Sequence, residues 1–374
     1  MIKIKSLRSY YLEFPLINPV VTSFGVMKAR PCIIIELEDF DKNIGYGEIW
    51  CNFPSDGASY RFHLLNSIYH KHIIGCEFSN PDKLIDKISE SFKTLFVQSG
   101  DLGSFRNINS GIDCAFWDLF AKNKKLPLNK LLNPDSKNGI SVYASGINPS
   151  ESHEQIATAK SMGIKAFKVK IGFNHSLDMD LLESLDNCFT SDEMMMLDVN
   201  QGWNIEEAQR YLNILEGFNF SWIEEPISAL SNQGEFKSVI NSTSCDLAFG
   251  ENINSVDEFI SLGKNNKSKY VQPDLTKYGG ISLINNLSKK IQSNKIWLHF
   301  LGGGVGLLTS AHIMSAINPS AYLETDININ PLRTSLFHNE LHIENGKISF
   351  NDDYGIGGPL NFDTVTKYLV SSNV

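Results

Sequence analysis

The sequence predicts an α/β protein built around a closed parallel barrel, with a smaller second domain. Strand-like segments alternate with helical ones through most of the chain, which is typical of right-handed βαβ units in a parallel sheet. Polar residues also recur at the ends of the strand-like segments, at steps of 28, 26, 27, 23, 25 and 25 residues after Lys170. Each step is the length of one strand, one helix and two loops, and seven or eight such units close a barrel.

Length and charge define the class of protein. A chain of 374 residues is longer than a barrel of roughly 250 residues and leaves room for an added domain. The formal charge of −9 and the pI near 5.5 argue against nucleic acid or an anionic membrane as partner. No apolar run reaches the roughly 18 residues of a transmembrane helix, and the N-terminus does not resemble a signal peptide. The cysteines show no C-x-x-C spacing, so reduced thiols in a cytoplasmic protein are expected.

The N-terminal part of the chain has the pattern of the smaller domain. Alternation of apolar and polar residues predicts an antiparallel three-stranded meander at residues 2–11, 29–38 and 45–50. Residues 17–24 are expected to form a connecting loop of the kind in which active-site lids are found. Helical spacing follows from residue 55 to 125, and a linker bracketed by Pro127 and Pro134 ends the domain.

The barrel elements follow in order. The first strand is expected at residues 141–145, and the later ones end in the polar residues described below. Helices are expected at residues 154–162, 178–187, 205–215, 255–262, 280–292 and 307–316. Hairpin-like alternation around Asn345-Gly346 predicts that residues 341–360 return to pack on the smaller domain.

Two lysines lie on one face of the strand at residues 166–171. Lys168 and Lys170 are two residues apart, so their side chains project to the same side. A solvated strand face is the ordinary explanation of such a pair. The polar strand ends that follow favour chemistry instead, because a like charge nearby lowers the pKa of a lysine toward the working pH of a base.

Carboxylates end the next three strands, at Asp198, Glu224 and Glu251. The carboxyl ends of parallel barrel strands converge on one mouth, so these side chains are expected to lie together. Taken singly, each acid is equally well explained by a salt bridge. Three hard oxygen ligands with open positions favour a Mg²⁺ site.

The remaining strands end in Asp274, His299 and Glu324. The carboxylate of Asp274 is expected to orient the imidazole of His299 and raise its basicity, although a lone histidine on an apolar strand is often a core residue. Glu324 is either a proton donor to a developing enolate or a strand-end ion pair. Residues 302–304 are three glycines, which form either a flexible loop or a place where backbone amides approach a ligand.

Short segments at these strand ends carry a resemblance to a known family. They are Lys168-Val169-Lys170, Asp198-Val199-Asn200, Trp222-Ile223-Glu224-Glu225-Pro226, Gly250-Glu251-Asn252, Gln272-Pro273-Asp274 and His299. In this order they resemble the enolase superfamily, specifically its mandelate racemase subgroup. The resemblance implies a modified (β/α)7β TIM-like barrel at residues 131–335, with an α+β cap formed by residues 1–130 and 336–374. It also implies Mg²⁺, since such sites use a lysine or histidine base with one or two Mg²⁺ ions.

The resemblance also implies roles for individual residues. It makes Lys170 the base on one face of the substrate and His299 the group on the opposite face. Glu225 replaces the glutamine common after the metal-binding glutamate. The full assignment is catalysis by Lys168, Lys170, Asp274, His299 and Glu324, metal binding by Asp198, Glu224 and Glu251, and substrate binding by Asn200.

We expect abstraction of the α-proton of a carboxylate substrate through an enediolate, and specifically dehydration of an acid sugar to a 2-keto-3-deoxy acid. Lys170 or His299 would remove the α-proton, and His299 would protonate the departing β-hydroxyl. A racemase or epimerase of a 2-hydroxy acid uses the same residues and is the alternative, and a non-catalytic binding protein is a third. The expected partners are a small carboxylate and further copies of the chain in a homo-oligomer, with no nucleic acid and no membrane.

Overall fold

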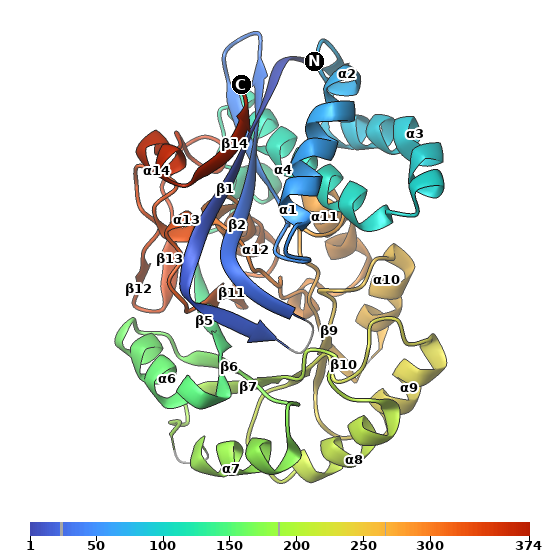
Figure 1. Ribbon diagram of the computed structural model, residues 1–374, viewed down its shortest axis with the longest axis vertical. Coiled ribbons are helices and arrows are strands. Elements are labelled where there is room, and N and C mark those ends of the chain that lie inside the picture. The colour runs from blue at the N-terminus through green and yellow to red at the C-terminus, as the bar shows by residue number, and fades with distance from the viewer. Residues whose placement is uncertain (23–24, 186–187, 266) are drawn as a thin grey trace.

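A sheet-rich cap stands above a barrel, and both chain ends lie in the cap (Figure 1). The computed structural model describes residues 1–22, 25–185, 188–265 and 267–374. The predicted fold class, an α/β barrel with an α+β cap, is confirmed. None of the helices in these ranges is long and apolar enough to cross a membrane.

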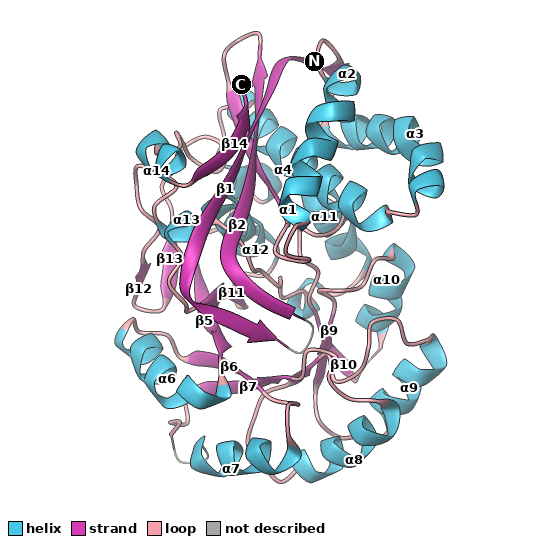
Figure 2. Ribbon diagram, in the orientation of Figure 1, coloured by secondary structure: helices cyan, strands magenta, loops and turns pink. Residues whose placement is uncertain are grey.

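The cap is an antiparallel sheet with helices on one side (Figure 2). The strands run in the order β14-β1-β2-β3, and β4 pairs with the start of β1. They are β1 (Ile2–Thr22), β2 (Gly25–Asp39), β3 (Ile44–Ile49), β4 (Glu77–Phe78) and β14 (Leu369–Asn373). The helices are α1 (Gly57–Leu64), α2 (His70–Ile73), α3 (Pro81–Ser99) and α4 (Leu102–Asn123).

Strand β2 is buried on both faces, which explains its run of isoleucines. Ile33 and Ile35 belong to the core beneath the cap helices, whereas Cys32 and Ile34 belong to the core shared with the barrel. Successive side chains of a strand point to opposite faces, so an uninterrupted apolar run serves two cores. Strand β2 therefore joins the cap to the barrel.

The barrel strands are parallel and pair in chain order, and the last one returns to the first. The strands are β5 (Gly139–Ile147), β6 (Ala166–Lys170), β7 (Met194–Asp198), β8 (Ile223–Glu224), β9 (Leu247–Phe249), β10 (Ser268–Val271) and β11 (Tyr322–Asp326). The helices between them are α6 (Ser152–Ser161), α7 (His175–Leu185), α8 (Ile205–Leu215), α9 (Gln233–Asn241), α10 (Val256–Lys264), α11 (Gly280–Lys290) and α12 (Gly304–Ile317).

The strand predicted to end at His299 is not a regular strand. Ile296 makes one parallel bridge to Val271, and Trp297 N–H donates to the Val271 carbonyl at 3.0 Å. On the other side, the Asn318 side chain donates to the Ile296 carbonyl at 3.1 Å in place of a strand partner. The segment keeps its place in the barrel through these few bonds.

Of the expected packing of residues 341–360 on the cap, only the later part is confirmed, since Ile356 N–H donates to Asp118 Oδ1 of the cap helix α4 at 2.7 Å. The predicted C-terminal hairpin forms, but it pairs with the barrel. It consists of β12 (Ile343–Glu344) and β13 (Lys347–Ser349), and β13 pairs with residues 139–141 of β5. Because β6 pairs with β5 only from Ala144 onward, the start of β5 has a free edge that β13 can occupy. Only the last strand of the chain, β14, joins the cap sheet.

Five further segments differ from the prediction. The linker contains a short helix, α5 (Leu128–Leu132), that was not predicted. Two later short helices, α13 (Pro331–Thr334) and α14 (Phe362–Lys367), were not predicted either. Helix α9 was not predicted, although its Asn232–Glu235 capping box is a recognisable signal. Residues 17–22 of the expected loop belong to a hairpin, because β1 extends to Thr22 and pairs with β2. This hairpin lies between cap and barrel (Figure 1). Residues 23–24 lie outside the described residues, and the lid function stays a prediction.

Two buried carboxylates of the cap hold the N-termini of barrel helices. Asp113 on α4 accepts hydrogen bonds from Ser282 N–H at 2.9 Å and Ser282 Oγ at 2.6 Å, at the start of α11. Glu48 on β3 accepts from Gly303 N–H at 2.5 Å and Gly306 N–H at 2.8 Å, at the start of α12. The first N–H groups of a helix have no partner within the helix, and these carboxyl oxygens accept from them, so these contacts fix the cap on the barrel.

We predict that Asp113→Asn changes how stability depends on pH. Burial raises the pKa of Asp113 to about 7 from 3.8, although Ser282 opposes the shift. A carboxyl group with a raised pKa contributes stability that is present below its unfolded-state pKa and is lost as pH rises through its folded-state pKa. Between about pH 4 and pH 7, the free energy of unfolding of the native protein should therefore fall relative to Asp113→Asn, by up to about 4 kcal/mol.

Urea unfolding at several pH values measures this difference. Asp86→Asn is the matched control, because Asp86 lies exposed on α3 with 71% of its side chain accessible. A pH-independent difference between the native protein and Asp113→Asn would contradict the prediction.

Candidate active site

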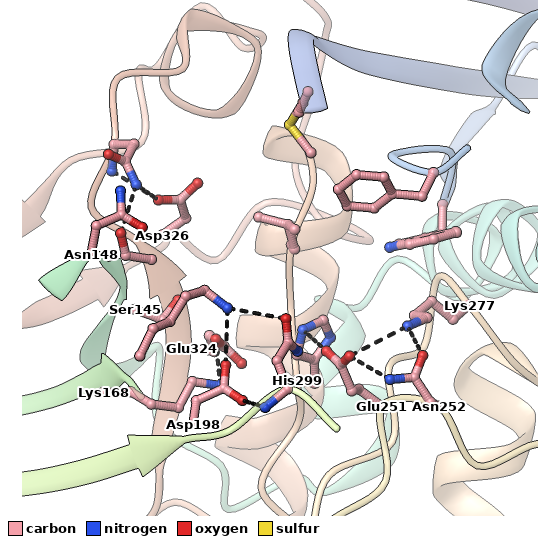
Figure 3. Close-up of a pocket in the computed structure, with 18 of the residues that line it drawn as sticks. Ser145, Asn148, Lys168, Asp198, Glu251, Asn252, Lys277, His299, Glu324 and Asp326 are labelled. Carbon is pink, nitrogen blue, oxygen red and sulfur yellow. Dashed lines mark hydrogen bonds and ion pairs between the residues drawn. The ribbon is translucent and has the colours of Figure 1, made fainter. Parts of the chain in front are cut away.

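A cavity of about 300 Å³ lies at the carboxyl ends of the barrel strands, next to the cap (Figure 3). The predicted site residues that line it are Lys168, Lys170, Asp198, Asn200, Glu251, His299 and Glu324. Glu224 and Asp274 lie behind this lining and bond to Lys168 and His299. All nine predicted residues thus gather in one place, and their individual roles stay predictions.

Lys168 is a buried cation held between two carboxylates. Its Nζ lies 2.6 Å from Glu224 Oε1 and 2.8 Å from Glu324 Oε1. Tyr143 Oη donates to the other oxygen of Glu324 at 2.9 Å. Burial lowers the pKa of Lys168, but the attraction of Glu224 and Glu324 outweighs it and holds this pKa well above its ordinary value. Lys168 is therefore a fixed positive charge, and Glu324 makes a strand-end ion pair.

Lys170 contacts the neighbouring strand end. Its Nζ lies 3.2 Å from Asp198 Oδ2 and donates to Asn200 Oδ1 at 3.3 Å. Burial and the charge of Lys168 lower the pKa of Lys170, but Asp198 outweighs both and the net pKa is raised. Lys168 thus lowers the pKa of Lys170 as predicted, but the net direction is opposite to the prediction because Lys170 contacts Asp198 directly.

Tight backbone turns bring the acidic strand ends together. Asp198 and Glu224 are paired in register on β7 and β8. After Asp198 the chain turns at Asn200, whose φ is 53° and whose N–H donates to Asp198 Oδ1 at 2.9 Å. Burial raises the pKa of Glu224 to about 7; Lys168 opposes the shift and the charge of Asp198 adds to it. Glu224 is thus a carboxyl group crowded by other acids.

Glu251 reaches the cavity through a glycine. The φ of Gly250 is 154°, and a Cβ there would lie 2.5 Å from the backbone of Gln272, so a larger residue would clash. Asn252 Nδ2 donates to Glu251 Oε1 at 2.6 Å and to Glu225 Oε2 at 2.8 Å. Burial is the main cause that raises the pKa of Glu225 to about 8, and the charge of Glu251 is the second. Glu225 is therefore a buried partner of Asn252.

His299 forms the predicted dyad. Its Nδ1 lies 2.8 Å from Asp274 Oδ2, and its Nε2 lies 2.5 Å from Glu251 Oε2. Thr276 donates to Asp274 Oδ1 through its N–H at 2.7 Å and its Oγ1 at 2.6 Å, which fixes the carboxylate. Burial lowers the pKa of His299, but Glu251 and other acids outweigh it and raise this pKa well above its ordinary value. The imidazole is thus oriented with Nε2 toward the cavity and is able to carry a proton.

The three predicted metal ligands suit Mg²⁺ in their chemistry. Asp198, Glu224 and Glu251 are hard oxygen donors from consecutive strand ends. Burial raises the pKa of Glu224, the charge of Asp198 raises it further, and a bound cation would oppose both effects. Within the described ranges, however, no group of three acidic, histidine or cysteine side chains is arranged to hold a metal. Each of the three carboxylates instead contacts a lysine or histidine nitrogen.

The amide of Gly303, the middle one of the three glycines at 302–304, is used within the protein. The N–H of Gly303 donates to Glu48 of the cap, and a Cβ at Gly302 would lie 2.5 Å from a Glu48 oxygen. Burial raises the pKa of Glu48 to about 7, although the hydrogen bonds from Gly303 and Gly306 lower it. The glycines thus serve the close approach of cap and barrel next to His299.

Several lining residues were not predicted. The cap contributes Met27, Arg30, Trp50 and Phe53, and the loop after Asp274 contributes Lys277. The Lys277 Nζ donates to Asn252 Oδ1 at 2.8 Å and lies 4.7 Å from the centre of the Trp50 ring. The rule that strand-end loops surround a barrel mouth could have found Lys277. No spacing in the sequence marks the cap residues.

Comparison with known proteins agrees with this geometry. Residues 9–133 match the mandelate racemase/muconate lactonizing enzyme N-terminal domain, and residues 151–364 match the enolase C-terminal domain-like model. L-talarate/galactarate dehydratase of Salmonella typhimurium is 30% identical over 74% of this chain and 69% of its own length. N-succinyl-L-Arg/Lys racemase of Bacillus cereus is 25% identical over 100% of this chain and 99% of its own length.

The fold is also that of solved structures. An enolase from Bradyrhizobium in complex with magnesium and mandelic acid superposes with a TM-score of 0.84 at 24% identity, covering 99% of each chain. With both domain models matched over most of the sequence, this chain belongs to the mandelate racemase/muconate lactonizing enzyme family of the enolase superfamily and is an enzyme of that class.

Proposed function

We propose that this protein is a Mg²⁺-dependent dehydratase that converts an acid sugar to a 2-keto-3-deoxy acid. The observation that carries the proposal is that one cavity brings together Lys170 and the Asp274-supported His299 beside three acidic strand ends. The dehydratase among the relatives supports the reaction type. The substrate is expected to be a small carboxylate.

Asp198, Glu224 and Glu251 would hold the metal. When bound, Mg²⁺ supplies positive charge that stabilises negative charge on the carboxylate oxygens of the substrate. A Bradyrhizobium protein of the same fold is complexed with magnesium and mandelic acid, which supports the proposal that this chain uses Mg²⁺. Lys168 adds a second, permanent positive charge, since two carboxylates hold it in its protonated form.

The reaction needs one base and one acid. Lys170 or His299, in its unprotonated form, removes the α-proton, and the electron pair of the C–H bond moves toward the carboxylate. His299 then delivers a proton from Nε2 to the β-hydroxyl, the C–O bond breaks and water leaves. The enol that remains takes up a proton and becomes the 2-keto acid. Asp274 stabilises the positive charge on the imidazole between these steps.

Racemisation or epimerisation of a 2-hydroxy acid is the second candidate. It is favoured by the presence of both Lys170 and His299 in the cavity, because inversion requires a group to remove a proton from one face and another to return it on the opposite face. The racemase among the relatives supports it. Dehydration differs in expelling a hydroxyl group.

We predict that activity depends on Mg²⁺ bound at Glu251. A chelator should abolish α-proton exchange with solvent and Mg²⁺ should restore it. Glu251→Gln should weaken Mg²⁺ binding about 10-fold or more, because a neutral amide is a poorer ligand for a hard cation. Calorimetry and exchange rates measure the two effects. Glu258→Gln on exposed α10 is the control, and unchanged affinity and rate in Glu251→Gln would refute the assignment.

We predict that His299→Asn separates the two reactions. In D₂O with Mg²⁺, the native enzyme should convert a 2,3-dihydroxy acid to a 2-keto-3-deoxy acid. His299→Asn should lose this conversion, because no acid remains for the leaving hydroxyl, while Lys170 still exchanges the α-proton. NMR follows both signals, and His338→Asn, at an exposed site, is the control. Recovery of only the 2-epimer from every polyhydroxy acid would reject dehydration in favour of the racemase.

A further inference from the structure

The cap side of the cavity contains a cation that the proposed reaction does not use. Met27, Trp50 and Phe53 form an apolar wall there, and Arg30 on β2 lies among them. Arg30 is 5% exposed, so its guanidinium is buried except where it meets the cavity. A buried cation on an otherwise apolar wall requires a partner.

Arg30 is only partly paired. Its Nη2 lies 2.8 Å from Asp326 Oδ2 on β11. Its Nε is buried and has no hydrogen-bond partner within the described part of the chain. A guanidinium has five N–H donors in a planar fork, so donors remain for a further acceptor.

Two guanidinium groups share one carboxylate at this point. Arg333 Nη1 lies 3.8 Å from the same oxygen of Asp326, and Arg333 Nη2 donates to the Asn328 carbonyl at 2.6 Å. The other oxygen of Asp326 accepts from the side chain of Asn328 at 2.6 Å. Two positive charges against one negative charge leave one uncompensated, although the chain as a whole has a net charge of −9. This part of the cavity therefore favours an anion.

Arg30 pairs with a residue that lies further along β11 than Glu324. Asp326 stands two residues after Glu324 on β11, so the two side chains share one face and Asp326 is nearer the strand end. Figure 3 shows Asp326 and Asn148 well apart from Lys168 and His299. A substrate whose α-carbon meets the catalytic groups would direct its far end toward Arg30.

We propose that Arg30 binds a second carboxylate at the far end of the substrate, so that the preferred substrate is a dicarboxylic acid. The inference rests on the proposed function, which defines the catalytic end of the cavity. The planar guanidinium fork matches a carboxylate in a bidentate manner. The competing interpretation gives Arg30 only the task of joining cap and barrel through Asp326.

Matched pairs of acids test the proposal. Galactarate and galactonate, and likewise glucarate and gluconate, differ only in a carboxylate or a hydroxymethyl group at the far end. The native enzyme with Mg²⁺ should show a higher kcat/KM for α-proton exchange with the diacid. Arg30→Gln should lower the diacid-to-monoacid ratio of kcat/KM about 10-fold or more, because a charge-assisted hydrogen bond is lost only with the diacid.

Two further variants separate binding from domain joining. Arg8→Gln is the control, since Arg8 pairs with Glu36 at 2.9 Å within the cap sheet and does not line the cavity, and it should leave the ratio unchanged. Asp326→Asn removes the carboxylate that competes for Arg30, so the ratio should rise. If Arg30 only joins the domains, Arg30→Gln and Asp326→Asn will impair both acids alike and leave the ratio unchanged, which overturns the proposal.

Binding measurements keep this test distinct from the test of the proposed function. Dissociation constants of each acid pair, measured by calorimetry with Mg²⁺ in proteins that also carry Lys170→Met and His299→Asn to prevent turnover, give a diacid-to-monoacid ratio for binding alone. Absence of α-proton exchange with every acid would count against the proposed function, whereas tighter binding of the diacids that is lost in Arg30→Gln would still support the role of Arg30. Equal binding of mono- and diacids by the protein that retains Arg30 would reject it.

Discussion

The crowding of buried carboxylates at the barrel mouth is the constraint on which this site depends. Acids from neighbouring strand ends repel one another in a poorly solvated interior, and each of them needs a cation. The pairs are Asp198 with Lys170, Glu224 and Glu324 with Lys168, and Glu251 with His299. A metal ion would bind within a cluster in which acidic and basic side chains already alternate. It would replace some of the contacts that Asp198, Glu224 and Glu251 make with lysine and histidine. The same alternation explains why the pKa of Lys170 is raised here, whereas the lysine pair alone would lower it.

The cap takes part in this arrangement and does more than cover it. Glu48 and Asp113 accept hydrogen bonds from the N-termini of two barrel helices, and Glu48 does so directly beside the segment that carries His299. Arg30 of the cap forms an ion pair with Asp326 of the barrel. Cap and barrel are thus joined by charges buried at their boundary, which also forms one wall of the cavity. Changes at this boundary are expected to affect both stability and substrate choice.

The order of strands and helices could be predicted because it depends on local periodicity. Strand β6 with its two lysines and the acidic ends of β7 and β8 lie where the alternation indicates. The exceptions depend on contacts between distant segments. The C-terminal hairpin pairs with β5 because the start of β5 has a free edge. The segment before His299 has few strand hydrogen bonds, and the Asn318 side chain bonds to it where a neighbouring strand would otherwise lie. Neither condition can be read from the segment itself.

The sequence by itself determined the barrel, the strand end at which each candidate residue stands, and the family. It did so because the spacing of residues along the chain determines which end and which face of a strand a side chain occupies. Only the tertiary structure decided which carboxylate each cation contacts, the direction of the pKa shift of Lys170, and the presence of Arg30, Trp50 and Phe53 on the cavity wall. These properties depend on distances between residues far apart in the chain and on the removal of water around them, and neither quantity is encoded in a local pattern.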